Sequence, residues 1–256
     1  MKIISCVNQK GGVGKTTTTL NVASGLAKLG KRVLVLDLDS QRNATTALNR
    51  GEYQGCSIND LLYFAVSGTP FDIHSYIRTN ETEHVDYIPA APVLASAPGI
   101  LATDRDSSTV LARVFCTAYF RERYDYLLID CKPSLDLLVI NALTASDELI
   151  VPVEPEDYAI DGLADLWSTV DRVRETINSD LKINGILITR ANMSRKKTKL
   201  AQEQLREVFG DLVYQTVIPN LADAAKALDE KKSLVNCPGL RLGQLYMEVS
   251  REVLVR

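Results

Sequence analysis

The chain has 256 residues, 46% of them hydrophobic, which is enough to bury the core of one large α/β domain. Its net charge of −3 excludes a globally basic nucleic-acid protein, so any DNA contact must come from a local patch. Five cysteines without C-x-x-C spacing argue against a disulfide framework or a zinc site and favour a reducing cytosol. No apolar run approaches the ~20 residues that span a bilayer, and no signal peptide precedes the first strand. We therefore expect a cytoplasmic protein with a single domain over residues 1–256.

Short β-rich runs alternate with helical patterns along the chain. This alternation predicts an α/β fold with a doubly wound, mainly parallel sheet and helices on both faces. The predicted strands are Lys2–Val7, Arg32–Asp37, Val85–Ile88, Tyr126–Asp130, Glu148–Val153, Ile183–Thr189 and Val213–Ile218. The predicted helices are Lys15–Leu29, Ser57–Val66, Ser107–Glu122, Ser134–Thr144, Ile160–Asn178, Lys199–Phe209, Leu221–Glu230 and Arg241–Leu254.

A glycine-rich loop follows the first strand and opens the first helix. Its glycines allow backbone angles that other residues avoid and turn successive N–H groups toward one point. The helix directs its positive end there too, which suits phosphate. Lys15 supplies a point charge for the β- and γ-phosphates, and the Thr16 hydroxyl suits Mg²⁺. We predict a nucleoside triphosphate site made by Lys10, Gly11, Gly12, Val13, Gly14, Lys15, Thr16 and Thr17.

Two later strands end in carboxylates, at the sheet edge where ligands collect in open α/β sheets. One strand runs into Asp37 and Asp39, although aspartate is also common in ordinary turns. The apolar run Tyr126–Asp130 has the form of a Walker B element, in which Asp130 holds Mg²⁺ directly or through water.

The densest basic cluster of the chain comes late in the sequence. Basic runs are often only the solvated start of a helix, but hydroxyl side chains at Ser194 and Thr198 interleave with this one and suit phosphate oxygens. Arg190, at the end of a predicted strand, could serve a nucleotide base or a nucleic-acid surface. We predict a DNA-binding patch formed by Arg190, Arg195, Lys196, Lys197 and Lys199.

The loop and the strand ends together resemble the deviant Walker family, which includes the ParA/Soj partition ATPases and the cell-division regulator MinD. The loop reads K-G-G-x-G-K-T-T, with Lys10 five residues before Lys15. The family's D-x-D-P-Q-G-N, D-x-P-P-S and I-P motifs have counterparts beginning at Asp37, Asp130 and Ile218. The sequence departs from these motifs where Ser40 replaces a proline, Arg42 a glycine and Lys132 a proline.

The resemblance implies roles for individual residues. Lys10 would reach across a dimer interface to the partner's ATP and act in catalysis together with Lys15. Asp39 would help to position the attacking water, and Asp37 would lie near the magnesium shell with Thr16 and Asp130. Pro219 and Asn220 would contact the base, although the arginine that usually follows this proline is absent.

The resemblance is closest to the ParA-type partition ATPases and implies a weak ATPase that uses ATP and Mg²⁺. Such a protein forms a homodimer with ATP, binds nonspecific double-stranded DNA at the nucleoid and moves a plasmid or chromosome through a ParB-like adaptor. One alternative is a ParA-like positioner of a protein cargo such as carboxysomes. Another is a MinD-like membrane-associated ATPase, but its basic amphipathic C-terminal helix is lacking, because Glu248 and Glu252 offset Arg251 and Arg256.

Overall fold

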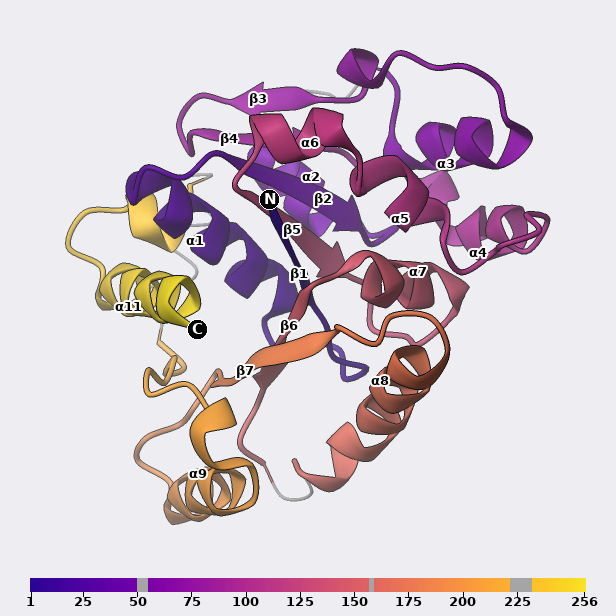
Figure 1. The fold of residues 1–256 in the computed structure, drawn as a ribbon. Coiled ribbons are helices and arrows are strands. Elements are labelled where there is room, and N and C mark those ends of the chain that lie inside the picture. The colour runs from indigo at the N-terminus through magenta and orange to yellow at the C-terminus, as the bar shows by residue number, and fades with distance from the viewer. Residues whose placement is uncertain (50–54, 157–158, 222–231) are drawn as a thin grey trace.

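A computed structural model describes residues 1–256 except 50–54, 157–158 and 222–231. Its centre is a seven-stranded sheet in the order β3-β4-β2-β5-β1-β6-β7 (Figure 1). All neighbouring strands run parallel except β3, which lies antiparallel to β4 at one edge. The strands are β1 (Lys2–Cys6), β2 (Val33–Leu38), β3 (Arg78–Asn80), β4 (Val85–Ile88), β5 (Tyr126–Cys131), β6 (Glu148–Val153) and β7 (Lys182–Ile188). This architecture confirms the predicted doubly wound α/β fold.

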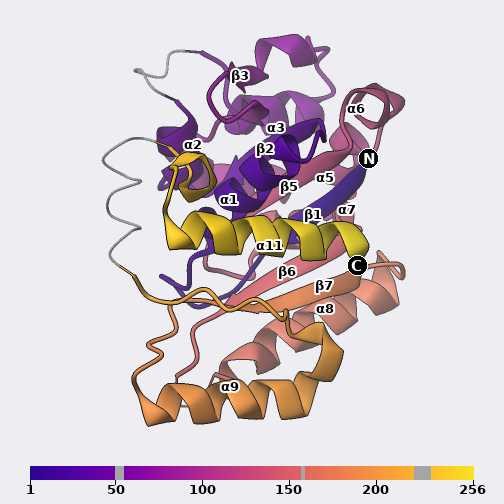
Figure 2. The ribbon, with the colours of Figure 1, turned by 90° about the vertical axis from the view of Figure 1, so that its left-hand side faces the viewer.

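Helices cover both faces of the sheet (Figure 2). The α-helices are α1 (Lys15–Lys28), α2 (Asn43–Leu48), α3 (Ile58–Ser67), α4 (Ala97–Leu101), α5 (Val110–Phe115), α6 (Ala118–Arg123), α7 (Leu137–Ala145), α8 (Ala164–Thr176), α9 (Lys196–Phe209) and α11 (Arg241–Val255). Short 3₁₀ helices are η1 (Ile73–Ser75), η2 (Pro92–Ser96), η3 (Asp161–Leu163), η4 (Gly210–Leu212) and η5 (Leu234–Asn236).

The alternation of apolar residues along β2 divides the core into two layers. Val33 and Val35 pack with α1 and α11 on one face of the sheet. Leu34, Leu36 and Leu38 pack on the other face, in the layer that includes α3, α4, α5, α7 and α8. Because helices cover both faces of the sheet, every residue of β2 from Val33 to Leu36 is apolar, and the two faces do not alternate between apolar and polar residues. The carboxyl ends of the parallel strands therefore meet at one edge of a rigid sheet.

The predicted strand Val213–Ile218 is wrong. Val213 forms an isolated bridge to Ile186, and Pro219, the residue after the segment, forms another to Ala191. Tyr214 and Ile218 also donate their N–H groups to carbonyls of β7, at 3.0 and 2.9 Å. The middle of the segment is satisfied in another way, because the backbone N–H groups of Gln215 and Thr216 donate to the carboxylate of Glu252 on α11 at 2.8 and 2.9 Å. A side chain from a distant helix thus replaces the ladder that a strand would form.

The predicted helix Ser107–Glu122 is also wrong as a single element. It divides into α5 and α6 at Thr117, whose backbone is extended (φ −97°, ψ 161°). The break lets Phe115 and Phe120, one from each helix, pack together at a centroid distance of 4.9 Å inside the core. Three elements were not predicted. Helix α2 lies just before residue 49, and the edge strand β3 and helix α4 lie within residues 49–106. The predicted helix Leu221–Glu230 lies, apart from its first residue, outside the described residues.

Candidate nucleotide site

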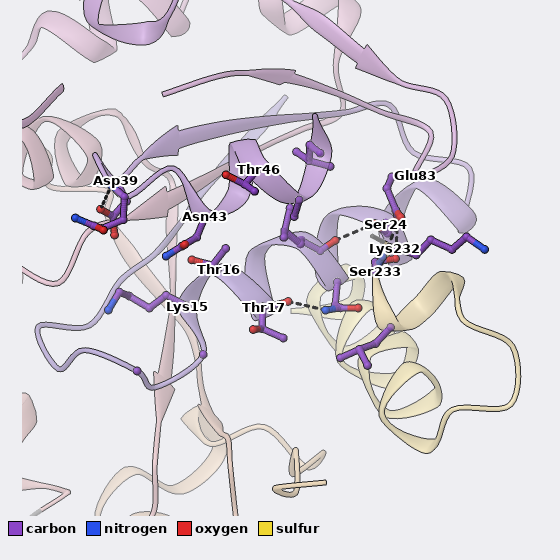
Figure 3. A pocket seen from close by; sticks show the side chains of 18 of the residues that line it. Lys15, Thr16, Thr17, Ser24, Asp39, Asn43, Thr46, Glu83, Lys232 and Ser233 are labelled. Atoms are coloured by element: carbon purple, nitrogen blue, oxygen red, sulfur yellow. Dashed lines mark hydrogen bonds between the residues drawn. The ribbon is translucent and has the colours of Figure 1, made fainter. Parts of the chain in front are cut away.

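A cleft of about 1000 Å³ opens at the carboxyl edge of the sheet, beside the start of α1 (Figure 3). The strand register brings its acidic residues together, since Asp37 at the end of β2 is paired with Asp130 at the end of β5. Asp130 is in turn the register partner of Cys6, the last residue of β1 before the loop. The predicted loop and strand-end carboxylates therefore share one site.

The loop between β1 and α1 forms one wall of this cleft. Gly12 and Gly14 have φ values of +77° and +85°, which side chains other than glycine rarely adopt, so the two glycines are required for the shape. Gly11, Gly12, Gly14, Lys15, Thr16 and Thr17 all line the cleft. Val13 does not, because its side chain is buried in the protein beneath.

The two lysines of the loop are held in different ways. Lys15 is buried, and its Nζ donates to the carbonyl oxygen of Lys10 at 3.0 Å. Burial lowers the pKa of Lys15, and the surrounding acidic groups oppose that shift. The side chain of Lys10 is half exposed and forms an ion pair with Glu156, in the segment that follows β6. Its backbone N–H donates to the buried Asn8 at 2.9 Å.

Asp37 and Asp130 form a buried acidic pair. Burial raises the pKa of Asp37 to about 6, although the carboxylate accepts hydrogen bonds from Thr45 and from the N–H of Asp39. Burial and the neighbouring Asp37 raise the pKa of Asp130 well above its ordinary value, while Thr16 lowers it. The Oδ2 atom of Asp130 is buried without a hydrogen-bond partner. A buried carboxylate oxygen that lacks a hydrogen-bond donor is suited to bind a cation.

The donor set fits Mg²⁺. In the described residues no three His, Cys, Asp or Glu side chains gather as a metal cage. Mg²⁺ commonly binds through one or two carboxylates and completes its shell with water and phosphate oxygens. The orphaned Asp130 oxygen and the Thr16 hydroxyl supply that partial set, while both oxygens of Asp37 are engaged by Thr45 and Asp39. Asp37 therefore supports the site mainly through its charge and through the loop that it holds.

The opposite wall of the cleft comes from the segment after β2. Asp39 lines it, and its Oδ1 accepts from the N–H of Gln41 at 2.9 Å. Arg42 has a φ of +59°, a left-handed conformation that favours glycine, which explains the glycine of the related motif at this position. Asn43 and Thr46 of α2 also line the cleft, and the sequence analysis did not identify them.

Lys132, the other charged departure from the related motifs, is paired within the chain. Its ammonium forms an ion pair with Asp136, whose Oδ1 accepts a hydrogen bond from the N–H of Leu138 in the first turn of α7. The charge at Lys132 thus strengthens the loop between β5 and α7.

The remaining predicted residues fall in two places. Arg190 lines the cleft and pairs with Glu154 at 3.6 Å, whereas Pro219 and Asn220 are not among the described residues that line it. Asn220 instead donates its N–H to the carbonyl of Ala191, next to Arg190, at 3.1 Å. The base-pocket role of Pro219 and Asn220 stays a prediction. Exposed basic residues at the start of α9 form the second group, which we call the α9 patch: Arg195, Lys196, Lys197 and Lys199.

The far end of the cleft holds a buried carboxylate that no sequence motif predicts. Glu83, between β3 and β4, is buried and accepts hydrogen bonds from Ser24 of α1 at 2.7 Å and from the hydroxyl of Ser233 at 2.6 Å (Figure 3). Asn236 also donates to it at 2.6 Å. These residues are distant in sequence and belong to no recognisable motif, so only the folded chain brings them together.

Comparison with known proteins identifies the family of this chain. The family described as AAA domain matches residues 1–183. The chain is 38% identical to the sporulation initiation inhibitor protein Soj of Bacillus subtilis, over 98% of each chain. It is 34% identical to the chromosome partitioning protein ParA of Caulobacter vibrioides, over 100% of this chain and 95% of that one. The solved structure of cobyrinic acid a,c-diamide synthase from Mycobacterium smegmatis, with a bound ATP analogue and magnesium, has a TM-score of 0.82 at 27% identity and covers 99% of this chain and 94% of its own. The chain therefore belongs to the Soj/ParA family of P-loop ATPases.

Proposed function

We propose that this ATPase is a partition motor of the ParA type. ATP and Mg²⁺ bring two copies together, the dimer binds nonspecific double-stranded DNA of the nucleoid, and a ParB-like adaptor speeds hydrolysis and releases it. The cargo is a plasmid or chromosome, and the name of the relative ParA, a chromosome partitioning protein, supports the chromosome. The observation that carries the proposal is the phosphate loop beside the buried acidic pair, with a second lysine, Lys10, at its rim.

Hydrolysis follows from the arrangement of the cleft. The loop N–H groups and Lys15 hold the phosphates, and Asp39 on the opposite wall orients the attacking water. Thr16 and Asp130 would hold Mg²⁺, which neutralises charge on the β- and γ-phosphates when bound. The catalytic residues are thus Lys10, Lys15 and Asp39.

Dimer closure requires Lys10 to leave its partner within the chain. The pair with Glu156 is about half exposed on both sides, at 50% and 56%. Exposed pairs of this kind contribute roughly 0–1 kcal/mol. Contact with a triphosphate of the second copy therefore outweighs the loss of the pair, and Lys10 is available to act in trans.

The α9 patch supports the DNA-binding role. Four cations gather within the first turn of α9 and the residue before it, with their side chains exposed. A two-fold axis doubles these contacts, which gives a steep dependence of DNA affinity on salt. Arg190 lines the cleft and pairs with Glu154, so in this proposal it contributes less to DNA binding than the α9 patch does.

Features of the C-terminal helix favour DNA over a membrane surface. The apolar face of α11 is committed to the core, since Leu242, Tyr246, Val249 and Val253 are buried against α1 and its neighbours. Arg256 stacks on Tyr214 at 4.5 Å. None of the helices in the described ranges is both long and apolar enough to cross a bilayer.

Retention on DNA with ATP, with ADP and without nucleotide, at several salt concentrations, tests the proposal. We expect retention only with ATP, and none on liposomes in a parallel flotation assay. The combined change Arg195→Ala, Lys196→Ala and Lys197→Ala should abolish retention while ATP binding persists. The pair Arg121→Ala and Arg123→Ala on α6, also exposed but elsewhere on the molecule, is the control for lost charge and should bind as the unchanged chain does. Equal retention with ATP and ADP, or flotation with the liposomes, would refute the proposed cycle.

A further inference from the structure

One hydrogen bond fastens the phosphate loop to a strand that carries no part of the loop motif. The hydroxyl of Thr189, immediately after β7, donates to the carbonyl oxygen of Val13 at 2.7 Å. Thr189 is 1% exposed and Val13 is also buried, so the bond lies beneath the loop and away from water. A longer contact of 3.3 Å joins the same hydroxyl to Val153, whose carbonyl already accepts the N–H of Thr189. Val13 is therefore the main acceptor of the hydroxyl proton.

This bond fixes the direction of a peptide group in the cleft. In a trans peptide the carbonyl of one residue and the N–H of the next point in opposite directions. The described residues contain no cis peptide bond. Because Thr189 holds the carbonyl of Val13 beneath the loop, the N–H of Gly14 points to the other side, and Gly14 lines the cleft. Among the described residues, no protein atom accepts a hydrogen bond from this N–H.

Without the hydroxyl, this peptide group could turn over. Gly14, at φ +85°, has no side chain to restrict such a rotation, and an added Cβ would approach Thr189 only to 3.9 Å. In a partly rotated orientation the Val13 carbonyl reaches water at the cleft, where it repels phosphate oxygens, and the Gly14 N–H no longer points at them. Returning it to the orientation that binds phosphate would then leave a buried carbonyl without a donor, which costs free energy at the moment of binding.

We infer that Thr189 is a positioning residue for nucleotide binding, because its hydroxyl sets the Gly14 N–H toward the phosphates. It touches neither the phosphates nor the reacting atoms itself. The inference depends on the ATPase site and not on DNA binding, dimerisation or the adaptor.

Thr189→Val tests the inference, since valine keeps the shape of threonine and removes the hydroxyl. We expect it to weaken MgADP binding about tenfold, the size of effect that an unsatisfied buried carbonyl produces. The KM for ATP should rise by a similar factor while kcat changes less than about twofold, because the chemistry of the bound state is intact. Thr189→Ser keeps the donor and should restore affinity to within about twofold of the unchanged chain.

A matched control separates this effect from the general loss of a buried hydroxyl. Thr169, in α8, is 5% exposed and donates to the carbonyl of Asp165 at 2.9 Å, far from the loop in sequence and fold. Thr169→Val should leave MgADP affinity unchanged. If Thr189→Val does not fold, Thr189→Ala allows the same comparison with serine. Three results would each overturn the inference. They are an MgADP affinity of folded Thr189→Val within twofold of that of the unchanged chain, equal weakening by Thr189→Ser and Thr189→Val, and a fall in kcat at unchanged KM.

Discussion

Asp130→Asn should change how the stability of the protein depends on pH. Asp130 is 1% exposed, its Oδ2 has no hydrogen-bond partner, and the Thr19 hydroxyl contacts its Oδ1 at a long 3.4 Å. Burial and the neighbouring Asp37 raise its pKa well above the ordinary value. A carboxyl whose pKa is raised by folding favours the folded protein while it is protonated. It costs stability as the pH rises through its pKa in the folded protein.

The neighbouring Asp37 sets the scale of the effect. Its pKa rises from 3.8 to about 6, a shift of about 2 units that corresponds to about 3 kcal/mol against the ionised form. Asp130 is also buried and has fewer hydrogen bonds, so burial opposes its ionisation in the same direction. An asparagine amide in its place introduces donors without acceptors, which lowers stability by about 1 kcal/mol or more at every pH alike. We therefore expect the stability of Asp130→Asn to fall less than that of the unchanged chain as the pH rises from acid to alkaline values.

Urea unfolding in EDTA at several pH values from 5 to 9 measures this difference. The unchanged chain should lose stability across the range, and Asp130→Asn should lose less. Asp125→Asn is the control, because Arg32 holds the pKa of Asp125 down at about 2, so this group is ionised throughout the range and its loss should lower stability equally at every pH. Adding Mg²⁺ and ADP should stabilise the unchanged chain and not the Asp130→Asn variant. Parallel pH curves for the two proteins would refute the reasoning.

Two other variants test the edges of the site. Glu83→Gln should destabilise the protein by about 2–4 kcal/mol at pH 7 in urea unfolding. Burial raises the pKa of Glu83, but hydrogen bonds from Ser233, Ser24 and Asn236 outweigh it and lower the pKa. The stabilising effect of Glu83 is therefore present above about pH 4.3 and is lost as the pH falls further. Glu207 is exposed, so the control Glu207→Gln should leave the free energy of unfolding unchanged at every pH. Glu156→Gln should lower the ATP concentration needed for dimerisation about two- to fivefold, because Lys10 then loses the carboxylate that competes for it. No shift in a sedimentation assay, or weaker dimerisation, would show that Glu156 does not restrain Lys10.

The part of the site that the sequence predicted is the part that strand geometry dictates. Apolar runs ending in Asp37 and Asp130, joined by helical crossovers, must bring their last residues to one edge of a parallel sheet. The role of the loop glycines was equally predictable from the sequence, since glycine is the residue that suits the backbone angles found at Gly12 and Gly14. In both cases the information is local to one motif or follows from a simple rule of topology.

The residues that were not predicted from the sequence act through contacts between segments that are distant in the chain. Glu83 gains its role from serines in α1 and just before η5, and Glu252 satisfies backbone groups that would otherwise pair in a strand. No spacing or periodicity encodes such partners. The predicted strand Val213–Ile218 failed for this reason, because its apolar pattern fits a strand and the acceptor for its N–H groups comes from α11.

The two lysines of the loop differ in how firmly the fold holds them, and this difference favours a two-step switch. The loop is fastened to β6 through Asn8, which donates to the carbonyl of Pro152 at 2.7 Å, and to the end of β7 through Thr189. Lys15 is buried within this preformed cradle, so phosphate binding requires little rearrangement. Lys10 sits on the same loop but extends half exposed to Glu156, and a weak pair is easily exchanged. We therefore expect nucleotide binding and the proposed dimer closure to be altered separately, the first at Thr189 and the second at Glu156.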